Sequence, residues 1–217
     1  MPFDHLGLDA IAMNPARQPV IQLMDAWLTE GRPPSDVALS GAFSDIYDDP
    51  CVAFLLREVF VQRYGFAVPL PSTVAEIASM GPILEVAAGT GYLSRLLEQA
   101  GAEVIATDGG DPGDFGLTAG TWYPVMTGTD AAEAIRQAPE FTVVLSWPDE
   151  GDWAVRALDA LAPGQRLILI GEGRGGCCAS QTFFDRLASD FERERALSHL
   201  TALPSLHDTV EVWRRIR

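Results

Sequence analysis

The chain has 217 residues, of which 47% are hydrophobic and 21% are charged, a balance that excludes an intrinsically disordered protein. Its formal net charge is −15 and all 15 basic residues are arginine, so the composition argues against nucleic-acid partners and excludes catalysis by lysine. The three cysteines, two of them adjacent, form neither a disulfide framework nor a group with metal-ligand spacing, so we expect no metal site.

Residues 1–80 are predicted to form a helical extension. Residues 17–30 carry apolar side chains at helical spacing, and Asp49 caps a second helix. A third helix is predicted to start at Thr73, because Glu76 follows at the spacing of a capping box. These helices either cover one edge of the core or form a wall of the substrate pocket.

The chain shows no targeting or membrane segment in its sequence pattern. The first ten residues lack a basic stretch followed by an apolar core, so they do not resemble a signal peptide. No apolar run approaches the length that crosses a bilayer. We therefore expect a cytoplasmic protein without a membrane partner.

The stretch that organises the chain begins with a buried strand at Ile83–Ala87. A glycine turn at Ala88–Gly91 follows, then a helix at Tyr92–Ala100 and a second apolar strand at Glu103–Thr107. The second strand ends in Asp108. Strand, turn, helix, strand and acid in this order predict a βαβ unit with a ligand site at the carboxyl ends of its strands.

The remainder of the chain alternates predicted helices and strands. Buried strands are predicted at Phe141–Leu145 and Arg166–Ile170, and a weak strand at Tyr123–Met126. Two strands, roughly Arg195–Leu200 and Thr209–Ile216, are expected to close the chain. Helices are predicted at residues 130–138, 152–162 and 180–188.

Two ligand classes fit the glycine turn. A dinucleotide fingerprint needs a third glycine where Ser94 stands. The run from Glu85 to Gly91 resembles the acid and spaced glycines of class I S-adenosylmethionine (SAM) methyltransferases, with Ala87 in place of the first glycine. This resemblance implies that Glu85 lies near the amino end of the cofactor and that Asp108 holds its ribose. The residues expected to contact SAM are Glu85, Ala87, Gly89, Gly91, Tyr92 and Asp108.

A second candidate cluster, Ser146-Trp147-Pro148-Asp149, follows the strand predicted beside the glycine strand. It partly resembles the turn with which amino-group methyltransferases orient the acceptor nitrogen, but aspartate stands where that turn has an aromatic residue. The resemblance implies that Ser146 and Trp147 line an acceptor pocket. In the alternative interpretation, Trp147 only packs beneath a loop.

Two further residues are candidate general bases. Glu172 lies between glycines after the fifth strand and would need a raised pKa, while His207 precedes the last strand beside Asp208. Each has an ordinary structural alternative: a solvated loop acid for Glu172 and a structural histidine for His207.

Much of residues 64–184 also resembles an uncharacterised subgroup of class I methyltransferase-like proteins. The shared features are an aromatic-Ala-x-Pro segment at Phe66–Pro69, the Trp147-Pro148 turn, and a Gly-Glu-Gly-x-Gly-Gly-Cys run at Gly171–Cys177. The resemblance implies a Rossmann-like α/β fold with a seven-stranded, mostly parallel sheet and helices on both faces. It is consistent with one domain over residues 1–217, in which an N-terminal extension (1–80) precedes the SAM-binding core (81–217).

These patterns predict a SAM-dependent methyltransferase that acts on a nitrogen or oxygen atom of a small-molecule or other non-nucleic-acid acceptor. Two alternatives remain open. One is an NAD(P)-dependent oxidoreductase that uses the same βαβ unit, and the other is a catalytically silent SAM-fold partner subunit. The oligomeric state and the identity of the acceptor cannot be read from the sequence.

Overall fold

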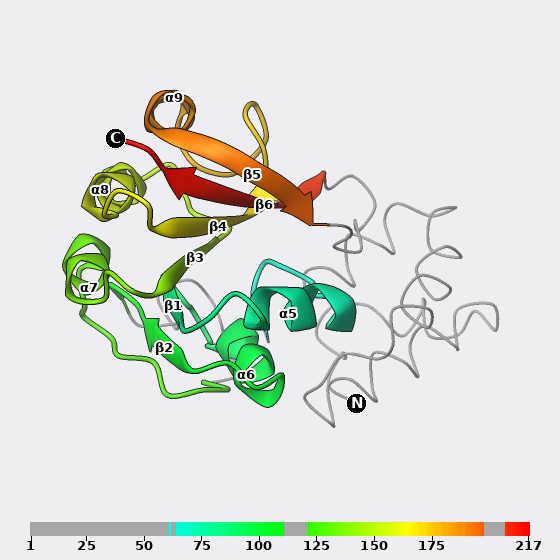
Figure 1. The fold of residues 1–217 in the computed structure, drawn as a ribbon. Helices are drawn as coiled ribbons and strands as arrows, with labels where there is room; N and C mark the ends of the chain where they lie inside the picture. The colour runs from blue at the N-terminus through cyan, green and yellow to red at the C-terminus, as the bar shows by residue number, and fades with distance from the viewer. Residues whose placement is uncertain (1–60, 62–63, 111–120, 198–206) are drawn as a thin grey trace, which may run out of the picture.

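The computed structural model describes residues 61, 64–110, 121–197 and 207–217, which form a mixed α/β fold (Figure 1). Within these residues one sheet has six strands in the order β2-β1-β3-β4-β6-β5. The two predicted helices that precede Val61 lie outside the described residues.

Four parallel strands form the part of the sheet that carries the site. β1 (Ile83–Val86) lies between β2 (Val104–Thr107) and β3 (Thr142–Ser146), and β4 (Arg166–Glu172) pairs with β3. The chain therefore runs from β1 outward to β2 and then returns to the other side of β1. Ligands of open α/β sheets bind at the carboxyl ends of strands where the strand order reverses in this way.

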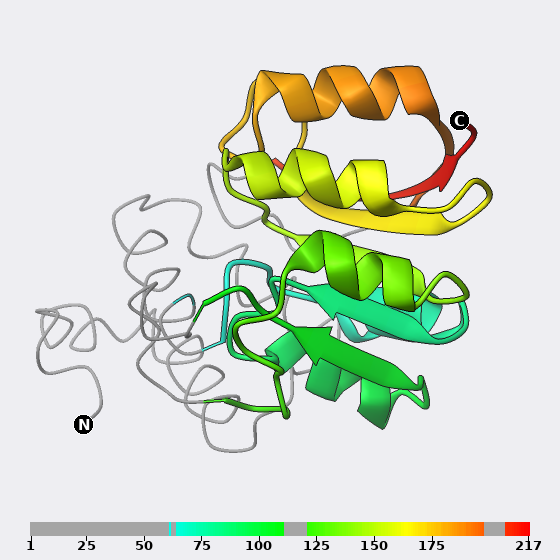
Figure 2. The ribbon, with the colours of Figure 1, turned by 90° about the vertical axis from the view of Figure 1, so that its left-hand side faces the viewer.

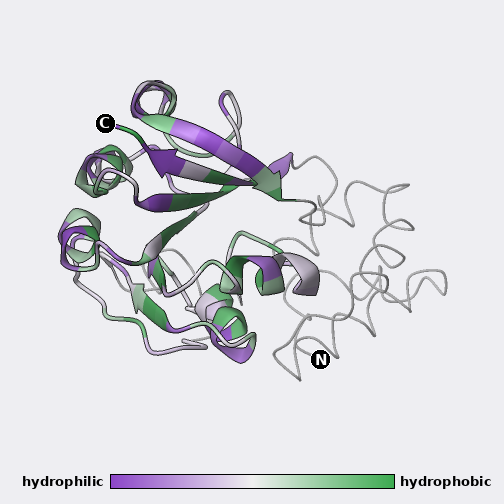
Figure 3. Cartoon of the chain, viewed as in Figure 1, coloured by the Kyte–Doolittle hydropathy of each residue, from purple (hydrophilic) through white to green (hydrophobic). Residues whose placement is uncertain are grey.

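The last two strands are antiparallel to their partners. β6 (Asp208–Arg215) pairs with β4, and β5 (Phe191–Leu197) pairs with β6 at the end of the sheet. The predicted closing pair is therefore present, although β5 begins four residues earlier than the sequence pattern indicated. Most of β5 has the hydrophilic colour in Figure 3, and the residues between Phe191 and Leu197 are exposed, as suits a strand with one neighbour.

Helices cover both faces of the sheet, as the sequence predicted. α5 (Pro71–Ala78) and α6 (Tyr92–Gln99) pack on one face through a cluster that includes Ile77, Leu97 and Val144. The other face carries α7 (Ala131–Gln137), α8 (Asp152–Ala160) and α9 (Gln181–Asp190), which lie side by side in Figure 2. Residues that alternate along β3 serve the two clusters in turn, so the strand is buried throughout its first four positions.

Two sequence predictions need correction. The described sheet has six strands and not seven, because the expected strand at Tyr123–Met126 contributes only an isolated parallel bridge between Met126 and Thr107. The third N-terminal helix begins at Pro71 and not at Thr73. Proline at the first helical position fixes a helical φ without losing a hydrogen bond, and Thr73 is buried inside the first turn instead of capping it.

Candidate functional site

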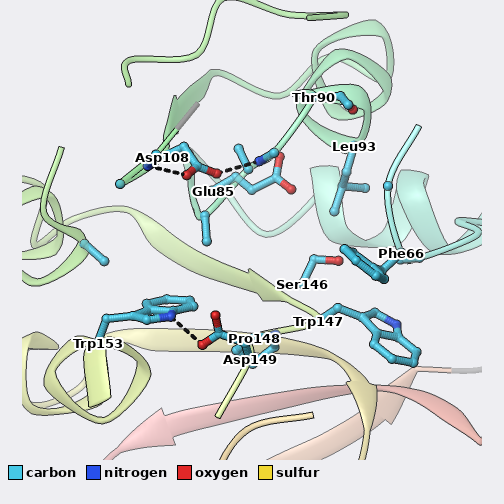
Figure 4. A pocket seen from close by; sticks show the side chains of 18 of the residues that line it. Phe66, Glu85, Thr90, Leu93, Asp108, Ser146, Trp147, Pro148, Asp149 and Trp153 are labelled. Atoms are coloured by element: carbon cyan, nitrogen blue, oxygen red, sulfur yellow. Dashed lines mark hydrogen bonds between the residues drawn. The ribbon is translucent and has the colours of Figure 1, made fainter. Parts of the chain in front are cut away.

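A cavity of about 790 Å³ opens at the carboxyl ends of β1, β2 and β3 (Figure 4). Its volume lies within the range of roughly 300–1,000 Å³ that is usual for small-molecule and cofactor sites. Segments distant in the sequence line it: residues 64–67, the glycine turn, the end of β2, residues 128–131 and the turn after β3. The position agrees with the ligand site that the βαβ unit predicted.

The glycine turn takes left-handed backbone conformations at three alternate positions. Ala87 has φ 54°, Gly89 has φ 55°, and Gly91 has φ 70° at the N-cap of α6. Ala87, Gly89 and Tyr92, all predicted to contact a cofactor, line the cavity. Gly91 is not among the lining residues. A Cβ built on Gly91 would lie 2.9 Å from both Tyr123 Cβ and Val125 Cγ2. The side-chain position of Gly91 therefore faces the segment Tyr123–Val125 and not the cavity.

Asp108 is 5% exposed and lies at the wall of the cavity, where β2 ends. Its Oδ2 accepts a hydrogen bond of 2.8 Å from the Gly89 amide, and its Oδ1 accepts one of 2.9 Å from the Gly110 amide. Each carboxylate oxygen has two lone pairs, so one acceptor position per oxygen stays available to a ligand hydroxyl. Asp108 therefore fixes the glycine turn and can also accept from a diol.

Glu85 is 2% exposed, yet it also lines the cavity, at the end of β1. The Ser94 hydroxyl of α6 donates a hydrogen bond to Glu85 Oε2, and Ser94 itself is fully buried. Burial raises the pKa of Glu85 to about 7, although the bond from Ser94 opposes this change. Ser94, the residue that breaks the dinucleotide fingerprint, thus supports an acid at the cavity floor.

The turn after β3 brings Ser146, Trp147 and Pro148 to the cavity, as the sequence predicted. Trp147 has φ 50°, a conformation that is costly for a bulky residue. Two backbone bonds hold the turn: the Trp147 amide donates to the Ile170 carbonyl over 2.8 Å, and the Ala179 amide donates to the Pro148 carbonyl over 2.7 Å. The alternative in which Trp147 only packs beneath a loop is incomplete, because Trp147 packs against the core cluster and also lines the cavity.

Glu172 does not fit the role of general base. Its Oε2 accepts from the Cys177 amide over 2.7 Å and its Oε1 accepts from the His207 amide over 3.1 Å. The bond from Cys177 is the main reason that the pKa of Glu172 is lowered, and not raised as a base would require. Glu172 is absent from the lining of the cavity. Its carboxylate instead ties the glycine-rich loop to the start of β6.

His207 also lies away from the cavity lining. Its side chain is 90% exposed, and its Nδ1 lies 3.9 Å from Glu172 Oε1. The structure therefore brings together the predicted cofactor residues other than Gly91 and the segment Ser146–Pro148, but not the two candidate bases.

Sequence reasoning missed several residues of the cavity. Phe66, which comes from the segment before α5, stacks on Trp147 with ring centroids 5.9 Å apart and planes tilted by 23°. At another part of the lining, the Trp153 indole donates to Asp149 Oδ1 over 2.7 Å, and Arg156 lies 3.9 Å from Asp130. The sequence did contain a signal for Trp153 and Arg156, because the helix that follows β3 begins at the edge of the sheet where the cavity lies. No sequence spacing connects Phe66 with Trp147.

The part of the chain that the structure describes contains neither a candidate metal site nor a candidate membrane-spanning helix. No group of three or more histidine, cysteine or acidic side chains there could hold a metal ion. No helix among the same residues is long and apolar enough to cross a membrane.

Comparisons with known proteins give a mixed result. No protein-family model matches the chain. Over 102 residues the chain is 36% identical to a phosphoenolpyruvate carboxylase from Pseudomonas syringae pv. tomato, a match that covers 46% of this chain. The matched part is 11% of the carboxylase, so the chain spans about a tenth of that relative's length.

The structural neighbours include several SAM-dependent methyltransferases. Magnesium protoporphyrin IX methyltransferase from Synechocystis, solved with bound SAM, is 19% identical with a TM-score of 0.44, covering 67% of this chain and 79% of that one. The N-methyltransferase NodS from Bradyrhizobium japonicum is 13% identical with a TM-score of 0.42, covering 68% and 94%. A SAM-dependent methyltransferase from Methanosarcina mazei is 13% identical with a TM-score of 0.45, covering 62% and 92%. All three TM-scores lie below 0.5.

Proposed function

We propose that the cavity binds SAM and that the protein transfers its methyl group to a nitrogen or oxygen atom of a small, non-nucleic-acid acceptor. The observation that carries the proposal is the pair of buried acids, Glu85 and Asp108, at the ends of adjacent strands on the two sides of the glycine turn. Asp108 would accept from the ribose hydroxyls, and Glu85 would face the amino group of the methionine portion.

The lining fits such a cofactor in charge and in shape. Beyond Asp108 the cavity continues to Thr129, Asp130 and Ala131, which leaves room for a base attached to the ribose. On the other side of Glu85, Ala87 and Gly89 present mainly backbone to the cavity, so a zwitterionic group can approach closely. SAM supplies an activated methyl group, so the protein has mainly to orient an acceptor and to exclude water.

Ser146 and the Trp147 backbone would orient the acceptor. Ser146 ends β3, the strand beside β1, and Trp147 follows it, so both stand across the cavity from Glu85 (Figure 4). With Glu172 tied to two amides and His207 outside the lining, no base is assigned among the described residues. An acceptor that arrives unprotonated at its nucleophilic atom needs none.

Calorimetric titration with SAM, its demethylated product S-adenosylhomocysteine (SAH), and NAD⁺ tests the proposal. We expect the first two to bind and NAD⁺ not to bind at the same concentrations. Preferential binding of NAD⁺ would contradict the methyltransferase proposal and favour an NAD(P)-dependent oxidoreductase. SAM binding without release of SAH, over a broad panel of metabolites, would instead favour the silent partner subunit.

A further inference from the structure

The inference concerns the class of acceptor, and it rests on the proposed SAM-dependent function. The turn Ser146-Trp147-Pro148-Asp149 carries no aromatic ring at its fourth position, so the turn alone cannot stack a flat acceptor on that residue. The fold supplies a ring from elsewhere. Phe66, about 80 positions earlier in the sequence, lies on the cavity wall and stacks on Trp147.

Phe66 is packed on one side and accessible on another. Its ring lies 5.9 Å from that of Trp147 in a nearly parallel arrangement, yet 38% of the residue is exposed. The neighbouring Ala67 and Val68 are buried in the core, so the backbone on its carboxyl side is anchored. In Figure 4 the Ser146 hydroxyl points toward the Phe66 ring. An accessible aromatic ring that a second ring holds in place is a surface on which another flat ring can stack.

The charges of the lining restrict the acceptor further. Among the described lining residues, four side chains are acidic (Glu85, Asp108, Asp130 and Asp149) and one is basic, Arg156. Arg156 belongs to α8 and lies 3.9 Å from Asp130, so it already has an acidic partner. A carboxylate or phosphate on the acceptor would therefore meet repulsion without a free arginine to compensate it.

We propose that the acceptor is a planar aromatic molecule without negative charge, whose ring stacks on Phe66 while its neutral amino group, which attacks through its lone pair without a base, reaches Ser146. Phe66 is then a specificity-determining residue. Its side chain binds the body of the acceptor and takes no part in holding the cofactor.

Matched probes test this proposal in the SAH-loaded protein. 2-Naphthol offers a flat, neutral ring system, decahydro-2-naphthol has the same skeleton without flatness, and 2-naphthoate adds a negative charge. We expect 2-naphthol to bind by calorimetry about three- to ten-fold more tightly than either analogue, the scale of one aromatic stacking contact. Equal binding of the flat and puckered alcohols, or binding of 2-naphthoate as tight as that of 2-naphthol, would overturn the proposal.

Variants locate the effect at Phe66. Phe66→Ala should weaken 2-naphthol by about ten-fold, and Phe66→Leu, which keeps apolar volume but loses the ring, should recover only part of that loss. Ile216→Ala is the matched control, because Ile216 is also a large exposed apolar residue but lies outside the cavity lining. SAH affinity should stay within about three-fold in all three variants. Loss of SAH binding in Phe66→Ala would place Phe66 at the cofactor and contradict its assigned role.

The remaining outcomes separate this proposal from the proposed function. If SAH binds but 2-naphthol does not, the aromatic acceptor is wrong and the SAM site stands. If SAH does not bind, the methyltransferase proposal fails. Titration of 2-naphthol into the unloaded protein then decides by itself whether Phe66 forms a site for flat rings.

Discussion

Single residues at the cavity serve both the fold and the ligand, and Asp108 is the clearest case. Its two oxygens accept from the amides of Gly89 and Gly110, so the carboxylate holds the glycine turn near the end of β2. Any substitution at this position therefore changes the turn as well as the wall of the cavity. Stability and affinity have to be measured together.

We predict that Asp108→Asn weakens SAM binding by at least ten-fold. Hydrogen bonds to a charged group contribute roughly 1.5–3 kcal/mol, and an amide offers one acceptor oxygen where the carboxylate offers two. Calorimetry with SAM measures the loss, and urea unfolding shows whether the variant is folded. Asp159→Asn is the control, because Asp159 is an exposed acid of α8 outside the cavity lining. A folded Asp108→Asn protein with wild-type affinity would remove Asp108 from the cofactor site.

Glu85 gives a prediction about pH. The pKa of its carboxyl is 4.5 when unfolded and about 7 in the folded protein, mainly because of burial, so between these values the unfolded state binds fewer protons. The associated stability is fully present below pH 4.5 and is lost as the pH rises through 7. Glu85→Gln removes this dependence, since glutamine does not titrate.

Urea unfolding of both proteins at pH 5 and pH 8 measures the effect of Glu85. The stability of Glu85→Gln relative to the wild type should rise by roughly 3 kcal/mol between the two pH values, the order of magnitude that corresponds to the pKa change. The comparison with the wild type cancels the other acids that titrate in this range. A difference that does not change with pH would mean that Glu85 is ionised in the folded protein throughout.

At the scale of elements, the junction between the glycine turn and α6 depends on the absence of a side chain at Gly91. The space where a Cβ would lie is filled by Tyr123 and Val125, and the Trp122 amide donates to the Thr90 carbonyl over 2.7 Å. The turn is therefore packed beneath the segment that follows residue 120. Its glycine serves this packing, while Gly89 serves the cavity.

We predict that Gly91→Ala destabilises the protein more than Gly101→Ala does. Both glycines have positive φ, 70° and 96°, so both alanine variants carry backbone strain. The Cβ at Gly101 would meet nothing within 4 Å, whereas that at Gly91 would meet two atoms at 2.9 Å. Denaturant midpoints should show an extra cost of about 1–3 kcal/mol for Gly91→Ala, the usual cost of overpacking. Equal midpoints would show that the segment around Tyr123 can shift to make room for the Cβ without a cost in stability.

Local sequence signals found the βαβ unit and failed where distant segments meet. The strands, the glycine turn and Asp108 follow from periodicity and spacing within about 25 residues, and the structure confirms their arrangement. The stacking of Phe66 on Trp147 depends on how α5 packs against the sheet, which no local pattern encodes. Glu172 was misread mainly for a local reason, because the bond that lowers its pKa most comes from the Cys177 amide, five residues later, and depends on loop geometry that no sequence pattern shows. The His207 amide, 35 residues later, adds a smaller contribution.

At the scale of the whole molecule, many of the arginine side chains that the structure describes pair with acids. Glu194 of β5 pairs with Arg166 over 3.1 Å and also with Arg214, while Arg193 pairs with Glu211 over 2.8 Å. These strands carry the strongly hydrophilic band of Figure 3. With a net charge of −15, such pairing leaves few cations for a phosphate backbone.

We therefore predict that the protein does not bind nucleic acid even at low salt. Non-specific binders reach dissociation constants of about 10⁻⁴–10⁻⁶ M because their lysine and arginine side chains release counterions from phosphates. Here the acids outnumber the basic residues two to one, and the cavity itself is lined by four acids and one paired arginine. Fluorescence anisotropy with a labelled DNA duplex and with a structured RNA, each at about 50 mM salt, should show no complex at protein concentrations up to about 100 µM, the weaker end of that range. Binding that weakens as salt is raised would reveal a basic surface outside the described residues, and the acceptor would then have to be sought among nucleic acids.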